Sequence, residues 1–203
     1  MGSRESSSQD ATPRVLLIGM MGAGKSTVGR ELARRTGWPY LDNDELVVRA
    51  TGRPTAEVLA TADEPTLRSA EAAALDQALA AEPPVIAGVA AGVVSDPEAR
   101  RKMHEGAFVV YLRAPVAVLA ERVGTDARRP WLDDDPVAAL ERLYEGREPL
   151  YEETADLILD VDGVTPADLA TRIVDALPGR RPMITRRPLR SRLRPRLPPG
   201  SSR

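Results

Sequence analysis

The chain has 203 residues, of which 42% are hydrophobic and 29% are charged, as in soluble globular proteins. It contains no cysteine, which excludes disulfides and thiolate metal sites and fits a reducing compartment. No apolar run approaches the roughly 20 residues of a membrane-spanning helix. The first 13 residues lack the apolar segment of a secretory signal. We therefore expect a cytoplasmic protein without a membrane partner.

Charge is distributed unevenly around a formal net charge of −2. Residues 1–12 carry a net charge of −1 and residues 178–203 carry nine arginines and no acid, so that residues 13–177 carry −10. We expect one domain over 13–177 between two disordered tails, 1–12 and 178–203. The acidic domain does not favour nucleic-acid binding, although the Arg/Pro-rich tail leaves RNA, acidic lipid or the domain itself as binding alternatives.

Short apolar runs alternate with helical patterns along the domain. The expected strands are 15–18, 40–41, 85–87, 108–112 and 157–161. The expected helices are 25–36, 44–50, 56–61, 66–80, 96–104, 115–123, 136–151 and 166–177. This alternation predicts an α/β fold, with a five-stranded parallel sheet covered by helices on both faces. Ligands of such sheets bind at the carboxyl ends of the strands.

A glycine-rich loop follows the first expected strand. The stretch "GMMGAGKS" matches the phosphate-binding pattern G-x-x-x-x-G-K-S and opens a helix. Amide groups of the loop and of the helix N-terminus, from Gly22, Ala23 and Gly24 to Thr27, would bind the phosphates of ATP. Lys25 would reach the β- and γ-phosphates, and the Ser26 hydroxyl would bind Mg²⁺. The alternative is a glycine-rich helix start without a ligand.

Two acids follow the second expected strand, in the sequence "LDND". At a strand end beside a phosphate loop, a carboxylate can hold Mg²⁺ or accept the proton of an attacking hydroxyl. We assign the metal to Asp42 and the acceptor hydroxyl to Asp44. The alternative is a helix N-cap at Asp42 or Asn43, which is compatible with both roles.

The chain resembles the shikimate kinases, which are P-loop kinases similar to nucleoside-monophosphate kinases. The resemblance begins with "GMMGAGKSTVGRELARRTGWPYLDNDELV" and continues through "LRSAEAAAL", "RRPWL" and "REPLYEETADLILD". It covers about residues 14–177. It implies a single P-loop kinase domain with a mobile lid, which acts on shikimate with ATP and Mg²⁺ in aromatic amino-acid biosynthesis.

The resemblance also implies an acceptor site. Arg68 and Arg147 would bind a carboxylate, because a guanidinium can donate two parallel hydrogen bonds to it. For one arginine alone, the alternative is a surface ion pair, here from Arg68 to Glu64 or Glu71. The lid arginine, Arg129 with Arg128 as its alternative, would neutralise the phosphoryl group during transfer.

One segment departs from the family pattern. Shikimate kinases have three consecutive glycines where this chain has Val89, Ala90 and Ala91, and the middle residue, here Ala90, contacts the substrate. An alanine in a left-handed conformation costs roughly 1–2 kcal/mol, and its methyl group intrudes toward the ligand. A backbone reshaped around Gly88 and Gly92 would relieve both problems. The loop "DVDGVTPADL" also lacks an arginine often found near adenine.

We predict ATP-dependent phosphorylation of a small hydroxylated carboxylate, with shikimate as the expected acceptor and shikimate 3-phosphate as the product. Two alternatives are a kinase of the same fold for gluconate or quinate, and a weakly active nucleotide-binding relative that serves as a partner protein. The altered glycine segment and the basic tail favour the last one, whereas the retained site residues argue against it. We expect a monomer.

Overall fold

The computed structural model describes residues 13–53, 57–58, 64–124 and 136–178. Its strands are β1 (Arg14–Ile18), β2 (Tyr40–Leu41), β3 (Val85–Gly88), β4 (Phe108–Arg113) and β5 (Leu157–Asp160). Its helices are α1 (Lys25–Thr36), α2 (Asn43–Thr51), α4 (Glu64–Ala80), the 3-10 helix η1 (Val93–Ser95), α5 (Pro97–Gly106), α6 (Val116–Gly124), α7 (Pro136–Thr154) and α8 (Pro166–Ala176). The five predicted strands are all confirmed.

The strands form one sheet in the order β2-β3-β1-β4-β5, and every pair is parallel. β1 lies at the centre, with Leu16 opposite Ala87 of β3 and Val109 of β4. All three side chains are buried, which explains why these strands are continuous apolar runs without polar alternation. The predicted α/β architecture is therefore confirmed.

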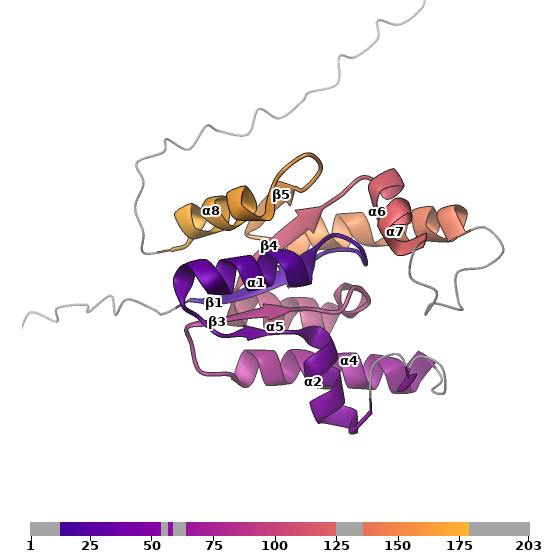
Figure 1. Cartoon of the computed structure of the whole chain (residues 1–203). Helices are drawn as coiled ribbons and strands as arrows, with labels where there is room; N and C mark the ends of the chain where they lie inside the picture. The colour runs from indigo at the N-terminus through magenta and orange to yellow at the C-terminus, as the bar shows by residue number, and fades with distance from the viewer. Residues whose placement is uncertain (1–12, 54–56, 59–63, 125–135, 179–203) are drawn as a thin grey trace, which may run out of the picture.

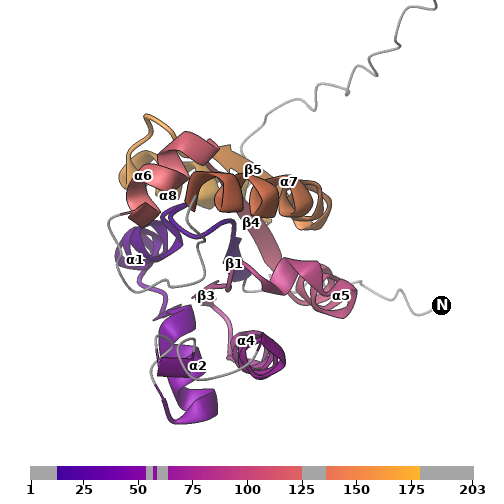
Figure 2. The same cartoon turned by 90° about the vertical axis from the view of Figure 1, so that its right-hand side faces the viewer.

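Helices cover both faces of the sheet. α1 and α8 pack together on one face, while α5 and α7 contact β4 from the other (Figures 1 and 2). α2 and α4 pack against each other beside the β2 edge (Figure 2). Within the described part of the chain, no helix combines the length and apolarity that crossing a membrane requires.

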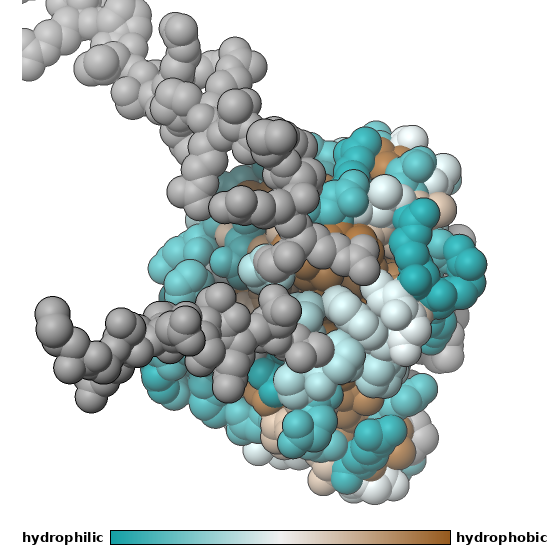
Figure 3. Space-filling view, turned by 90° about the vertical axis from the view of Figure 1, so that its left-hand side faces the viewer, coloured by the Kyte–Doolittle hydropathy of each residue, from teal (hydrophilic) through white to brown (hydrophobic). Residues whose placement is uncertain are grey.

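The two ends of the sheet differ in chemistry. At the amino end of β1, the Arg14 guanidinium donates to the carbonyl of Gly106 and to that of Ala81, each at 2.8 Å. These carbonyls lie at the ends of α5 and α4, where helices leave backbone acceptors without intrahelical partners. On this face, Figure 3 shows hydrophilic side chains around several apolar patches. The cavity described next lies at the opposite, carboxyl end.

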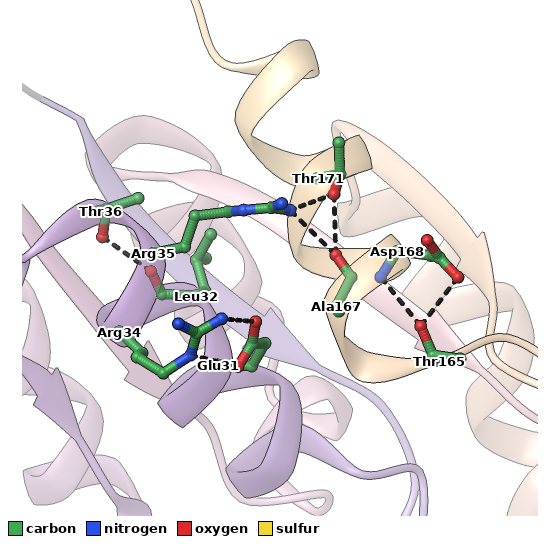
Figure 4. A network of polar contacts seen from close by, with 9 residues as sticks. All are labelled: Glu31, Leu32, Arg34, Arg35, Thr36, Thr165, Ala167, Asp168 and Thr171. Atoms are coloured by element: carbon green, nitrogen blue, oxygen red, sulfur yellow. Dashed lines mark hydrogen bonds and ion pairs between the residues drawn. The ribbon is translucent and has the colours of Figure 1, made fainter.

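The first and last helices are joined by a polar contact (Figure 4). The Arg35 guanidinium near the end of α1 donates to the Ala167 carbonyl at 3.0 Å and to the Thr171 hydroxyl, both on α8. The Thr165 hydroxyl caps α8 by accepting from the backbone N–H of Asp168 at 3.1 Å. These contacts fix the start of α8 relative to the helix that follows the phosphate loop.

Candidate active site

A cavity of about 1030 Å³ opens at the carboxyl ends of the strands. Its lining includes five basic and three acidic side chains, although residues 13–177 as a whole are acidic. A cavity that gathers positive charge in an acidic protein favours small anionic ligands. The predicted site residues that line it are Gly22, Ala23, Gly24, Lys25, Ser26, Thr27, Asp42, Asp44, Arg68, Ala90 and Arg147. Arg129 and Arg128 lie outside the described residues.

Three glycines of the phosphate loop, Gly19, Gly22 and Gly24, have a positive φ. Gly19 has φ +139°, and a Cβ atom there would lie 2.6 Å from the Leu112 carbonyl oxygen of β4. Gly24 has φ +90° and is the N-cap of α1, which carries no side-chain cap. The N-terminal amides of α1 thus remain available to an anion at the loop.

Lys25, the first residue of α1, folds back over this loop. Its ammonium group donates to the Gly19 carbonyl at 2.8 Å and to the Met20 carbonyl at 3.0 Å. The positive charge is therefore held beside the amides that would bind the phosphates. This geometry agrees with the role that the glycine-loop pattern predicts for Lys25.

The two aspartates after β2 have different environments. Asp42 is 9% exposed, caps α2 by accepting from the Asp44 amide at 3.1 Å, and pairs with Arg30 at 3.3 Å between Nη2 and Oδ2. Asp44 lies in the first turn of α2, is exposed, and lines the same cavity. The N-cap alternative is thus correct for Asp42, while Asp44 is the more exposed of the two aspartates that line the cavity.

The residues at this point also suit a magnesium ion. The Ser26 hydroxyl and the Asp42 carboxylate line one cavity and could supply oxygen ligands. Mg²⁺ prefers oxygen, and it commonly keeps several waters while binding one or two protein ligands and substrate phosphates. Ser26 and Asp42 would therefore hold the ion against the phosphates.

The ion pair considered for Arg68 is present in the cavity wall. Arg68 Nη1 lies 2.8 Å from Glu71 Oε2, one helical turn along α4. Both residues line the cavity, together with Arg147 of α7. The local ion pair and a ligand-binding role are therefore compatible, because Glu71 can hold a guanidinium that still faces the cavity.

The altered glycine segment adopts ordinary backbone conformations. None of residues 88–92 has a positive φ, so Val89, Ala90 and Ala91 avoid the left-handed conformation and its cost. All three line the cavity. The strain considered from the sequence is therefore absent at these three residues.

Tyr151 of α7 holds residues 89–91 in place through a contact that no sequence pattern predicted. Its hydroxyl donates to the Ala91 carbonyl at 2.7 Å, and its ring stacks on Tyr111 of β4 at 4.9 Å between centroids. The side chain is buried, and burial raises the pKa of its hydroxyl well above the usual value, so the donor stays protonated. No local pattern reveals a contact that spans 60 residues of sequence.

Two further residues near the site, Tyr40 and Arg122, were not predicted from the sequence either. The Tyr40 ring fills the space left by Gly29, because a Cβ atom at that position would lie 2.2 Å from the ring. The Tyr40 hydroxyl lies close to Gly88 in the same way, since a Cβ atom there would be 2.8 Å from its oxygen. Arg122 of α6 lines the cavity and donates to the Gly22 carbonyl at 3.1 Å.

One part of the cavity wall is apolar. It comprises Val161, Val164, Pro166 and Leu169, from the end of β5 to the first turns of α8. Flat heteroaromatic bases bind against apolar surfaces of this kind. The Arg35 contact to α8 sets the position of this wall relative to the phosphate loop.

The central strand β1 is followed by a phosphate loop, and the loop lines a cavity that gathers cations. These features together define a P-loop kinase of small molecules. Comparison with known proteins makes this class specific. A family model described as shikimate kinase matches residues 21–178. The chain belongs to the shikimate kinase family.

Several relatives agree with this placement. The shikimate kinase of Dechloromonas aromatica is 42% identical over 147 residues, which cover 72% of this chain and 80% of that one. The shikimate kinase of Halorhodospira halophila is 40% identical over 167 residues, covering 82% and 94%. A structure of shikimate kinase from Acinetobacter baumannii in complex with shikimate superimposes with a TM-score of 0.76 at 31% identity, covering 81% and 92%.

Proposed function

We propose that this protein transfers the γ-phosphoryl group of ATP to a hydroxyl of shikimate, yielding ADP and shikimate 3-phosphate. The observation that carries this function is that the phosphate loop, Asp44, Arg68 and Arg147 line one cavity in a member of the shikimate kinase family. ATP and Mg²⁺ are the cofactors of the family.

The roles of the residues follow from their positions. The amides of residues 22–27 and the Lys25 ammonium bind the phosphates and neutralise the charge that spreads over the transferred group. Ser26 and Asp42 would hold Mg²⁺, which when bound would neutralise more of that charge. Arg68 and Arg147 grip the carboxylate of shikimate and so orient its ring.

Asp44 is proposed to accept the proton that the acceptor hydroxyl loses. The substrate hydroxyl oxygen forms a bond to the γ-phosphorus while the bond from that phosphorus to the β-bridging oxygen breaks. The Asp44 carboxylate accepts the hydroxyl proton and orients the attacking oxygen. Arg129 is proposed to reach the transferred group from the lid segment, which lies outside the described residues.

The test is a coupled ADP-release assay of the full chain with shikimate, quinate and gluconate in parallel. Turnover with shikimate, at a kcat/KM at least about tenfold above that for the other two, is expected. Turnover on quinate or gluconate alone would reject shikimate as the acceptor and keep the kinase. ATP binding without turnover on any of them would favour the nucleotide-binding partner protein.

We further propose that the enzyme is a monomer in the cytoplasm. The absence of cysteine supports a reducing compartment. Light scattering during size-exclusion chromatography tests the oligomeric state, because a dimer would double the measured mass.

A further inference from the structure

The Arg68–Glu71 ion pair lies directly on the backbone of Gly92. A Cβ atom at Gly92 would be 1.7 Å from Arg68 Nη1, 2.8 Å from Arg68 Cζ and 2.9 Å from Glu71 Oε2. Contacts below 3.0 Å do not occur for a real Cβ atom, so the bare Cα is what allows the guanidinium to lie there. The Arg68 side chain is 38% exposed and its Glu71 partner 13% exposed.

Conformation does not explain a glycine at this position. Gly92 has φ −80° and ψ −22°, which any L-amino acid adopts readily. The glycine is therefore required by space and not by its dihedral angles. The group that occupies this space is the guanidinium proposed to bind the substrate carboxylate.

The backbone at Gly92 cannot easily retreat from an added methyl group. The Ala91 carbonyl accepts from the Tyr151 hydroxyl at 2.7 Å, and the Gly92 carbonyl accepts from the Ser95 amide at 3.1 Å. Val93 and Val94, which follow, are 5% and 1% exposed. The end of a long, partly exposed side chain moves more easily than a loop held by hydrogen bonds and buried neighbours on both sides. A methyl group at residue 92 would therefore displace the Arg68 guanidinium and not the loop.

We propose that Gly92 is a positioning residue for acceptor recognition, because it sets how deeply the Arg68 guanidinium lies against the loop after β3. This inference rests on the proposed function, since it concerns the acceptor end of the same cavity.

The test is Gly92→Ala in the full chain, assayed with shikimate and ATP varied separately. The KM for shikimate is expected to rise about tenfold, while the KM for ATP stays within about twofold. The melting temperature should stay within about 2 °C, because a side chain yields and not the loop. Gly146→Ala is the control, because a Cβ atom on this α7 glycine meets nothing within 4 Å.

A second pair of variants tests whether Gly92 acts through Arg68. In an Arg68→Lys background the colliding Nη1 atom is absent, so adding Gly92→Ala should change the shikimate KM by less than about twofold. A tenfold rise in that background would overturn the inference. So would an unchanged shikimate KM in Gly92→Ala alone, or a melting temperature lowered by more than about 5 °C. A wild-type chain that is inactive on shikimate would instead reject the proposed function.

Discussion

Lys25 is one of only two lysines in the chain, and its ammonium group is held over the phosphate loop by the carbonyls of Gly19 and Met20. Lys25→Met keeps the length and the apolar stem of the side chain and removes its charge. We expect kcat to fall about 100-fold or more, because a preorganised positive charge at the transferred group is lost. Circular dichroism should show an unchanged fold. A variant that keeps more than a tenth of wild-type turnover would contradict the role of the loop.

Asp44 and Asp42 are two residues apart, but they differ in exposure and in hydrogen bonding. Asp44→Asn should lower kcat at least about tenfold with little change in the KM for ATP, because the exposed carboxylate lines the cavity and is proposed to accept the proton of the acceptor hydroxyl. Steady-state kinetics with both substrates varied measure this. If the dependence on Mg²⁺ changes while kcat does not, the proton-accepting role belongs to Asp42 instead.

At the scale of elements, helix α7 is joined to the loop after β3 through the Tyr151 hydroxyl. Tyr151→Phe keeps the ring that stacks on Tyr111 and removes the hydrogen bond to the Ala91 carbonyl. Leaving that acceptor without its donor should cost about 1–3 kcal/mol of the free energy of unfolding. The shikimate KM should rise as well, because residues 89–92 line the cavity or support Arg68.

The matched control is Tyr144→Phe, whose hydroxyl bonds to Glu148 within the same helix. Denaturant unfolding and shikimate kinetics are measured for both variants. The comparison shows whether an effect is specific to the Tyr151 hydroxyl or follows from removing either tyrosine hydroxyl of α7. Equal effects in both variants would show that Tyr151 does not hold the loop.

The elements themselves were largely predictable from sequence. Apolar runs place all five strands, because the buried strands of a parallel sheet need no polar alternation. Helix ends were less certain: α5 continues to Gly106, two residues past the expected end. The helix expected over 56–61 falls mostly outside the described residues. Contacts between distant elements, such as Arg35 to Ala167 or Tyr151 to Ala91, leave no periodic pattern.

Part of the candidate site was also predictable from the sequence, and part was not. The glycine loop and the acids after β2 are local patterns with a chemical reason, and the structure brings them into one cavity. The steric role of Gly92 depends on an arginine 24 positions earlier in the chain, so only the folded arrangement reveals it. Arg129 stays a prediction.

At the scale of the whole molecule, the family match and the last described helix both end near residue 178. Leu177 is buried, so we place the test deletion after Pro178. Removing residues 179–203, with their nine arginines, should leave shikimate kcat/KM within about twofold and the melting temperature within about 2 °C. A melting temperature several degrees lower would show that the tail docks on the acidic domain.

All four tyrosines of the chain lie in described elements, and burial raises the pKa of each hydroxyl, that of Tyr111 to about 12. Above pH 10, the unfolded chain releases these protons while the folded chain retains them, so stability present below pH 10 is lost as the pH rises. The ultraviolet band of tyrosinate should therefore appear together with unfolding and not as a gradual titration. Parallel absorbance and circular dichroism scans in alkali would check this, and tyrosinate forming while the fold persists would contradict it. Because a ligand that binds only the folded chain stabilises it, saturating ATP should move both signals to higher pH, so this chain carries an optical reporter of ligand occupancy without any label.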